Sequence, residues 1–439
     1  MMTDIKEKLE QIRKERHSRS KSRVVSETWE KIKKEEDLST REKLERLINL
    51  TQDQRPDKSR TTAFEPLRRE PLQFFENGFS LDARYGNIKI SSGLEIRGDI
   101  LSCLSQEAAF RDLDLSTALF IDLETTGLSG GTGVIPFNVG MGYYRDDKFC
   151  VVQYFLGELA EEERMVQELA QFFKDMNFQS VVTYNGKGFD IPLLETRFIL
   201  CRQPFILSEL PHLDFLYAAR RLWSHKYESC RLYHLALDVV QADRSEDIPS
   251  AEIPWRYFQY LQTGNFELIE PILYHNQEDI LSLLGVVIIG AHIFSEDPEL
   301  CRGDAMDFYG AGKIMENVGN VEKSVQFFQR ALSGSLSDEV SLEAKKRLSS
   351  HFKRNEEWEK AVPLWEEMTS SRVVTPAQLY SFRELAMYLE HRLKKYEEAK
   401  RIAEEGFVLS TGVSSFYEKD FSYRLERLRR KIRQQKEKA

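Results

Sequence analysis

The stretch that decides the fold is residues 118–128, ALFIDLETTGL, in which an apolar run leads into a turn that contains a glycine. The run predicts a buried strand, and its end carries two carboxylates, Asp122 and Glu124. Because side chains alternate between the two faces of a strand, both acids project from the same face. Carboxylates held together raise each other's pKa unless a cation compensates them, so the pair can share one divalent ion. Taken alone, the segment is also typical of an ordinary strand that ends in a polar turn.

Two later segments add acidic side chains to this pair. VVTYNGKGFDIPLLETR (181–197) places Asn185 and Asp190 around a turn that leads into a predicted helix, where a lone aspartate is also typical of a helix cap. LYHNQEDILSLL (273–284) sets His275 four residues before Asp279. That spacing brings both side chains onto one face of a helix, although a lone pair of this kind is also typical of a surface contact.

The region around these segments mixes strands and helices. Strands are predicted at residues 118–123, 150–156 and 180–184, and helices at 161–176, 191–201, 230–240 and 266–294. Hairpin strands come first and an alternation of helix and strand follows. This order predicts an α/β fold with a mixed sheet and flanking helices, over residues 116–297.

The regions before this domain differ from it in composition. Residues 1–60 are highly charged with isolated apolar positions, which predicts a solvated helical or disordered segment. Within it, STREKLERLINL (39–50) has the pattern of a capped amphipathic helix. Residues 61–115 change to short alternating segments with turn residues, which predicts a small β-containing lead-in.

Residues 300–415 are predicted to be all-helical and to repeat with a period of about 37 residues. Small residues where paired helices touch, with aromatic residues between them, resemble tetratricopeptide repeats; an ordinary helical bundle is the alternative. The recurring residues are Gly312, Met315, Gly319, Ser324, Phe328 and Ala331, then Ser349, Phe352, Trp358, Ala361, Trp365 and Met368, and more loosely Ala386, Tyr396, Ala399 and Ala403. Residues 416–439 form a basic helix, typical of either a solvated terminus or a phosphate-binding segment.

Composition bounds the class of protein. A chain of 439 residues with 30% charged and 41% hydrophobic residues is typical of a soluble protein of two or three domains. The longest apolar run, 280–294, is shorter than the roughly 20 residues that cross a bilayer, so it predicts a buried helix. The N-terminus lacks the apolar core of a secretory signal and the five cysteines are scattered, so we expect a cytoplasmic protein without membrane association. A net charge of -9 argues against broad nonspecific binding of nucleic acid, but it is compatible with a local basic path along which a strand could bind.

Together, Asp-x-Glu, Asn-x-x-x-x-Asp and His-x-x-x-Asp, in this order, resemble the DEDD exonuclease superfamily, also called DnaQ-like, on a ribonuclease H-like fold. Within it, the sequence resembles the YprB-like ribonuclease H-like proteins through SGGTGVIPFNVGMG, YNGKGFDIPLLETR, HLDFLYAARRLW and YHNQEDILSLL. The resemblance covers residues 118–294, and the helical repeat tail fits it as well.

The resemblance implies a metal-dependent nuclease, a 3′ to 5′ exonuclease that hydrolyses single-stranded DNA or RNA. Two Mg²⁺ or Mn²⁺ ions about 4 Å apart would activate water and stabilise the leaving oxygen. Their carboxylate ligands would be Asp122, Glu124, Asp190 and Asp279. Substrate contacts would come from Thr125, Asn185 and Lys187, with the repeats available to a protein partner.

Two neighbouring residues compete for the role of general base. In the superfamily a histidine stands five residues before the last aspartate, or a tyrosine four; here Tyr274 has the first spacing and His275 the second. On a helix, the residue four before Asp279 lies about 40° away around the axis and the residue five before lies about 140° away. His275 is therefore the predicted base, and Tyr274 regains a claim if the chain is irregular there.

Two other classes of protein stay open on the sequence. One is a catalytically silent nucleic-acid-binding module that keeps the acidic site, and the other is a tetratricopeptide-like interaction scaffold whose nuclease-like domain is structural. The presence of all four carboxylates disfavours both, because a silent site gains nothing from unpaired acids. The sequence does not distinguish DNA from RNA as the substrate, or an exonuclease from an endonuclease. It also does not identify the ligand of the repeats, the oligomeric state or the pathway.

Overall fold

The computed structural model describes residues 71–127, 133–295, 301 and 303–438. These residues belong to a compact unit that spans Arg68–Ala439. A first unit, Met1–Leu67, lies outside them. The predictions for residues 1–60, including the amphipathic helix at 39–50, therefore concern residues outside the described part of the chain.

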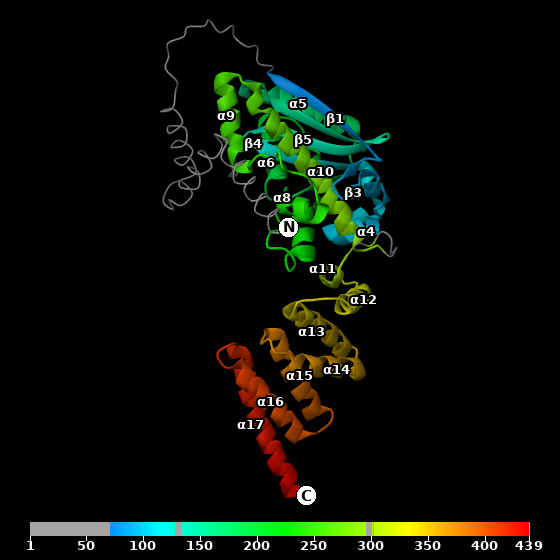
Figure 1. Ribbon diagram of the computed structural model, residues 1–439, viewed down its shortest axis with the longest axis vertical. Coiled ribbons are helices and arrows are strands. Elements are labelled where there is room, and N and C mark those ends of the chain that lie inside the picture. The colour runs from blue at the N-terminus through cyan, green and yellow to red at the C-terminus, as the bar shows by residue number, and fades with distance from the viewer. Residues whose placement is uncertain (1–70, 128–132, 296–300, 302, 439) are drawn as a thin grey trace, which may run out of the picture. The chain divides into compact units, whose positions relative to one another are not determined.

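A six-stranded mixed sheet forms the centre of the α/β region, as predicted (Figure 1). Its strands, in spatial order, are β1 (Leu72–Ser80), β6 (Lys148–Leu156), β5 (Pro136–Arg145), β4 (Ala118–Thr125), β7 (Ser180–Thr183) and β8 (His212–Asp214). The first four pair antiparallel, whereas β4, β7 and β8 are parallel. Strand β1, from the predicted lead-in, is an edge strand of this sheet, and a short ribbon of β2 (Arg84–Tyr85) and β3 (Ile88–Lys89) follows it. Strands β5 and β8 were not predicted.

Helices cover both faces of the sheet and give it two hydrophobic cores. One face packs against α5 (Glu162–Met176), α6 (Asp190–Leu200) and α9 (Ile253–Thr263). The other packs against α4 (Gly98–Ser105), α7 (Phe215–Trp223), α8 (Leu232–Leu235) and α10 (Glu270–His292). In β4, Leu119, Ile121 and Leu123 belong to the first core and Phe120 to the second. The alternation therefore turns Asp122 and Glu124 toward α10.

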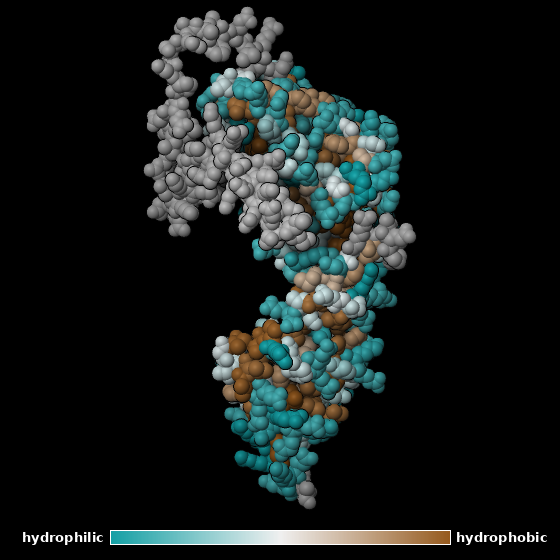
Figure 2. Space-filling model, in the orientation of Figure 1, coloured by the Kyte–Doolittle hydropathy of each residue, from teal (hydrophilic) through white to brown (hydrophobic). Residues whose placement is uncertain are grey.

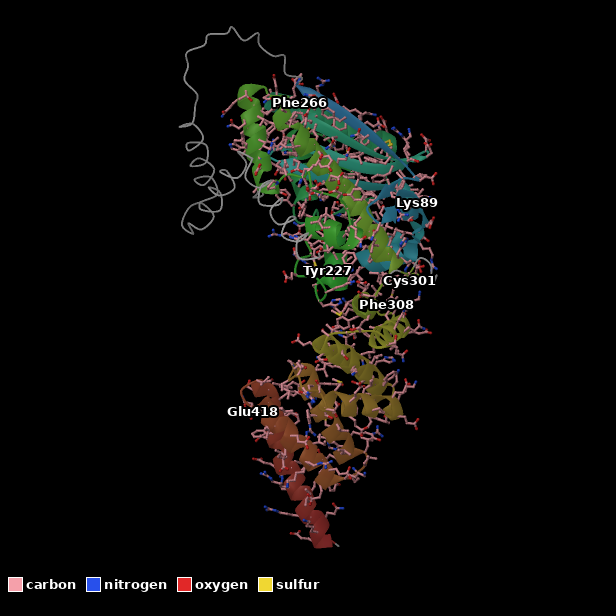
Figure 3. All side chains as sticks on the ribbon, viewed as in Figure 1. Lys89, Tyr227, Phe266, Cys301, Phe308 and Glu418 are labelled. Carbon is pink, nitrogen blue, oxygen red and sulfur yellow. The ribbon has the colours of Figure 1, made fainter. Side chains whose placement is uncertain are left out.

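Helix α10 runs the length of the α/β region. Figure 3 places Phe266, just before α10, at one end of this region and Cys301, just after it, at the other. The segment Phe266–His292 is long and apolar enough to cross a membrane, but 72% of its most apolar window is buried inside the protein. It is the buried helix that the sequence predicts. Pro271 lies in its first turn, where a missing N–H does no harm, so α10 includes Tyr274 and His275 without a kink.

The chain after α10 is all-helical among the described residues, as predicted. Its helices are α11 (Ala305–Asn317), α12 (Val321–Leu332), α13 (Asp338–Arg354), α14 (Trp358–Thr369), α15 (Pro376–His391), α16 (Tyr396–Ser410) and α17 (Ser415–Lys438). Successive helices pack on each other, and a Cβ added at Gly312 would lie 2.6 Å from the Phe328 ring. Figure 2 shows apolar surface near the turn between α16 and α17, where Val408 and Phe416 are 70% and 61% exposed.

The basic helix α17 uses part of its charge inside the protein. Arg424, Arg427 and Lys431 all donate hydrogen bonds to Glu390 of α15, whose side chain is fully buried. In contrast, Arg429 and Arg430 face solvent. One face of α17 is thus structural, and only its outer face is free for the phosphate-binding alternative.

Candidate active site

The first two acids, Asp122 and Glu124, lie near the C-terminal end of β4. Asp122 is opposite Gly140 of β5 and Glu124 is opposite Asn138, and the register shifts directly after Glu124. Such an irregularity re-aims the side chains beside it. Glu124 is only 9% exposed, so its carboxylate lies in a largely desolvated place between the sheet and α10.

Asn276 of α10 holds the first acid. Its Nδ2 donates to Asp122 Oδ2 at 2.9 Å, and its Oδ1 accepts from Gln153 Nε2 of β6 at 2.9 Å. This contact requires Gly140, because a Cβ there would lie 1.8 Å from Asn276 Oδ1. The sequence analysis missed Asn276, although a buried polar residue directly after His275 in an apolar helix is a signal for such a role.

The third acid, Asp190, is the first residue of α6 and is buried. The turn before it is fixed by Asp214 at the end of β8. One Asp214 oxygen accepts the Asn185 N–H at 2.8 Å, and the other accepts the Lys187 N–H at 3.0 Å. The φ of Asn185 is 69°, a left-handed conformation that asparagine tolerates. Asp214 thus positions the turn that delivers Asp190.

His275 and Asp279 project from α10 toward the sheet acids. His275 Nε2 lies 3.9 Å from Glu124 Oε1 and 3.6 Å from Asp279 Oδ2. Among the described residues, Tyr274 has no hydrogen bond or ion pair to a site carboxylate and is partly exposed. The helix geometry therefore turns His275, rather than Tyr274, into the acidic site.

Two residues that the sequence analysis missed complete this cluster. Arg244 Nη1 lies 2.5 Å from Asp279 Oδ1, and Arg244 Nη2 lies 2.5 Å from Asp247 Oδ2. Asp247 Oδ1 in turn lies 2.6 Å from His275 Nδ1. Both residues belong to an irregular, highly charged stretch, QADRSEDIPS (241–250), with no spacing that could have singled them out.

Burial and mutual repulsion determine the electrostatics of the acids. Burial, and then the charges of the neighbouring acids, raises the pKa of Asp122 and of Glu124 well above their usual range. Burial also raises the pKa of Asp190 to about 7, against backbone hydrogen bonds that lower it. Burial opposes a charge on His275, but the nearby Asp279 and Asp247 prevail and raise its pKa.

The donor set fits a hard divalent cation. Carboxylate oxygens are the ligands that Mg²⁺ and Mn²⁺ prefer, and an added positive charge would remove the repulsion among these buried acids. As arranged here, no three His, Cys, Asp or Glu side chains of the described residues form a closed metal cluster. The acids come from β4, α6 and α10 and lie close enough to raise one another's pKa.

The three candidate substrate contacts have different surroundings. Thr125 is buried, and its hydroxyl donates to the Gly127 carbonyl at 2.7 Å. Lys187 Nζ lies 2.6 Å from Glu107 Oε1. Asn185 is exposed and is part of the lining of an open pocket of about 350 Å³ with Arg220 and Arg231. Asn185 and Lys187 are thus both exposed, whereas Thr125 is buried.

Comparison with known proteins defines the class. A family model described as RNase_H superfamily matches residues 119–289, the range that contains all four acids. The α/β region is therefore a ribonuclease H-like domain of a nuclease superfamily. Along a longer stretch, the chain is 31% identical over 332 residues to YprB of Bacillus subtilis (strain 168), covering 75% of this chain and 78% of YprB. The chain belongs to the YprB family.

One solved structure is similar over part of its length. It is the family B DNA polymerase from the archaeon Pyrobaculum calidifontis, with a TM-score of 0.34 and 16% sequence identity. The match covers 49% of this chain and 29% of the polymerase, so this chain spans under a third of that protein.

Proposed function

We propose that the protein is a metal-dependent phosphodiesterase, a 3′ to 5′ exonuclease that acts on single-stranded DNA or RNA. The observation that carries this proposal is the convergence of Asp122, Glu124 and Asp190, each with a raised pKa, beside Asp279 and a histidine. Two Mg²⁺ or Mn²⁺ ions, when bound, would supply activation of water and stabilisation of the leaving oxygen. The 3′ to 5′ polarity rests on the resemblance of the three motifs to the DEDD exonucleases.

The chain's own residues divide the work in this proposal. The four carboxylates would hold the cations, and Asn276 orients Asp122 through the 2.9 Å hydrogen bond. His275 accepts the proton of the attacking water at Nε2, the nitrogen that faces Glu124 and Asp279. The exposed Asn185 and Lys187, at the turn before Asp190, contact the strand.

The test is digestion of end-labelled single- and double-stranded DNA and RNA, with EDTA and with Mg²⁺ or Mn²⁺. We expect cleavage only with the ion, fastest on a single strand, with mononucleotides released from a 3′-labelled end first. Asp122→Asn, purified in parallel, controls for a contaminating nuclease. An absence of cleavage on all four substrates would contradict the proposal, and internal cuts would replace the exonuclease by an endonuclease.

A further inference from the structure

The segment between α8 and α9 crosses over one face of α10. After the π-helical turn Ala236–Val240, residues 241–250 bring in Arg244 and Asp247, whose side chains are 0% and 2% exposed. On α10 they meet His275, Asp279 and Ser282, which are four and three residues apart and share a face. Two site residues of α10 are thus held by a second, separate piece of chain.

Arg244 connects two carboxylates across this contact. Its guanidinium lies 2.5 Å from Asp279 Oδ1 and 2.5 Å from Asp247 Oδ2, and it stacks 5.3 Å above the Tyr233 ring. A buried guanidinium is costly unless its charge is paired. Here it donates a hydrogen bond to Asp279 through Nη1 and forms an ion pair with Asp247 through Nη2. Because Oδ1 of Asp279 is engaged, Oδ2 is the oxygen on the side of His275 Nε2.

Asp247 determines which ring nitrogen of His275 carries the proton. A carboxylate accepts hydrogen bonds, so its 2.6 Å contact with Nδ1 favours the ring with a proton on Nδ1. The neutral ring then has its free lone pair on Nε2. That atom has Ser250 Oγ at 3.4 Å, Asp279 Oδ2 at 3.6 Å and Glu124 Oε1 at 3.9 Å.

We propose that Arg244 and Asp247 are positioning residues that lock His275 and Asp279 into one arrangement, with the Nε2 lone pair and Asp279 Oδ2 both directed into the acidic site. The proposal rests on the proposed function for the role of His275. It assigns the 241–250 segment to the site, which neither the motifs nor the family resemblance does. The two residues act through His275 and Asp279, and they do not contact the strand.

A second buried arginine in the same domain provides the matched control. Arg197 of α6 is also buried and is hydrogen-bonded to Glu162 of α5, with side-chain exposures of 8% and 14%. This partner, Glu162, is not one of the site acids. Replacing it removes a comparable ion pair without touching the proposed arrangement.

The first experiment uses Asp247→Asn, which keeps the shape of the side chain. Its amide can donate to Nδ1 and so favours the ring with a proton on Nε2, which removes the lone pair from the site. We expect kcat to fall about 10²-fold while KM and the Kd for Mn²⁺ each change less than about 3-fold. Long-range ¹⁵N–¹H spectra, recorded at a pH where the ring is neutral and assigned with His275→Ala, should show the proton move from Nδ1 to Nε2.

The second experiment compares Arg244→Lys and Arg244→Gln with Arg197→Lys. Lysine keeps the charge but not the fork, so we expect Arg244→Lys to retain about 10-fold more of kcat than Arg244→Gln. Arg197→Lys should match the thermal destabilisation of Arg244→Lys and keep kcat within about 3-fold of the wild type. Thermal unfolding of all three variants shows whether loss of activity follows loss of fold.

Three results would overturn the proposal: an unchanged kcat in Asp247→Asn, an unchanged His275 tautomer in that variant, or equal losses of kcat in Arg244→Lys and Arg197→Lys. The tautomer spectrum does not require activity. If the wild-type protein cleaves nothing, the proposed function fails. The spectrum still shows whether Asp247 determines the tautomer of His275.

Discussion

Two buried acidic sites in this chain have pKa shifts in opposite directions. In the helical region, Glu390 is fully buried, and burial acts against its charge. Hydrogen bonds from Arg427 and Lys431 nevertheless lower its pKa to about 2. In the α/β region, burial raises the pKa of Asp122 and Glu124 with no described lysine or arginine hydrogen-bonded to either.

The difference separates a structural acid from a candidate functional one. The helices α15 and α17 carry both signs of charge, so Glu390 is satisfied by the protein itself. At the sheet site, Arg244 pairs with Asp279 and Asp247, but no lysine or arginine of the described residues is hydrogen-bonded to Asp122 or Glu124, so these two acids repel each other inside the protein. Removing a charge should therefore destabilise the first place and relieve the second.

The largest expected effect is on catalysis at the sheet site. Asp122→Asn or Glu124→Gln should lower the cleavage rate with Mn²⁺ by about 10³-fold or more, because the cation loses a ligand. Without metal, either variant should be as stable as the wild type or slightly more stable, because like-charge repulsion is relieved. Single-turnover cleavage and thermal unfolding in EDTA measure the two effects. A variant that cleaves at the wild-type rate would show that the assigned site is wrong.

The next effect separates the two candidate bases. With saturating Mn²⁺, His275→Ala should lose about 10²-fold in kcat/KM, whereas Tyr274→Phe should lose little. The wild-type kcat/KM should rise with pH as His275 loses its proton, because only the unprotonated ring can act as a base. That acidic limb should disappear in His275→Ala. The reverse ranking of the two variants would return the role to Tyr274.

The third prediction tests the helical half of the comparison. Glu390→Gln leaves Arg424, Arg427 and Lys431 without their common partner, so the free energy of unfolding of the helical region should fall by about 3–5 kcal/mol. Urea unfolding followed by circular dichroism measures it, with Asp122→Asn in EDTA as the contrasting variant. Equal stability of Glu390→Gln and the wild type would remove the distinction between the two acidic places.

The smallest effect concerns the end of α17. Removing residues 432–439 should leave stability unchanged, whereas truncation at Ser422 removes the partners of Glu390 and should destabilise the protein as Glu390→Gln does. The salt dependence of single-strand binding by the variant that lacks residues 432–439 then reports on the exposed Arg433 and Lys436. A flatter slope would assign them to phosphates, and an unchanged slope to a solvated surface.

Much of the fold could be predicted because its signals are local. The apolar runs of β4, β6 and β7 and the periodicity of α5, α6 and α10 predict those elements to within a few residues. Strand β5 was not predicted, because Gly140 and Gly142 weaken the sequence pattern of a strand. The same glycines let α10 approach the sheet: a Cβ at Gly142 would lie 2.5 Å from Ile280 Cγ2. The two glycines thus explain both why β5 was not predicted and why α10 can pack closely on the sheet.

The candidate site divides in the same way. The motifs singled out Asp122, Glu124, Asp190 and Asp279 because each lies at a strand end or on a helix face with regular spacing. Arg244 and Asp247 could not be found, because they reach α10 through an irregular segment whose position depends on the tertiary fold. Short-range patterns identify the acids, and long-range contacts identify what orients them.

The central claim is that the sheet acids are built for a divalent cation, and calorimetric titration of the metal-free protein with Mn²⁺ at pH 7.5 tests it most directly. We expect wild-type protein to bind Mn²⁺ and release protons, because ligands with raised pKa values must ionise, and to unfold at a higher temperature once loaded. Asp122→Asn should bind at least about 10-fold more weakly, and Glu390→Gln should bind as the wild type does. Equal Mn²⁺ binding by wild type and Asp122→Asn, or no binding by either, would contradict the claim.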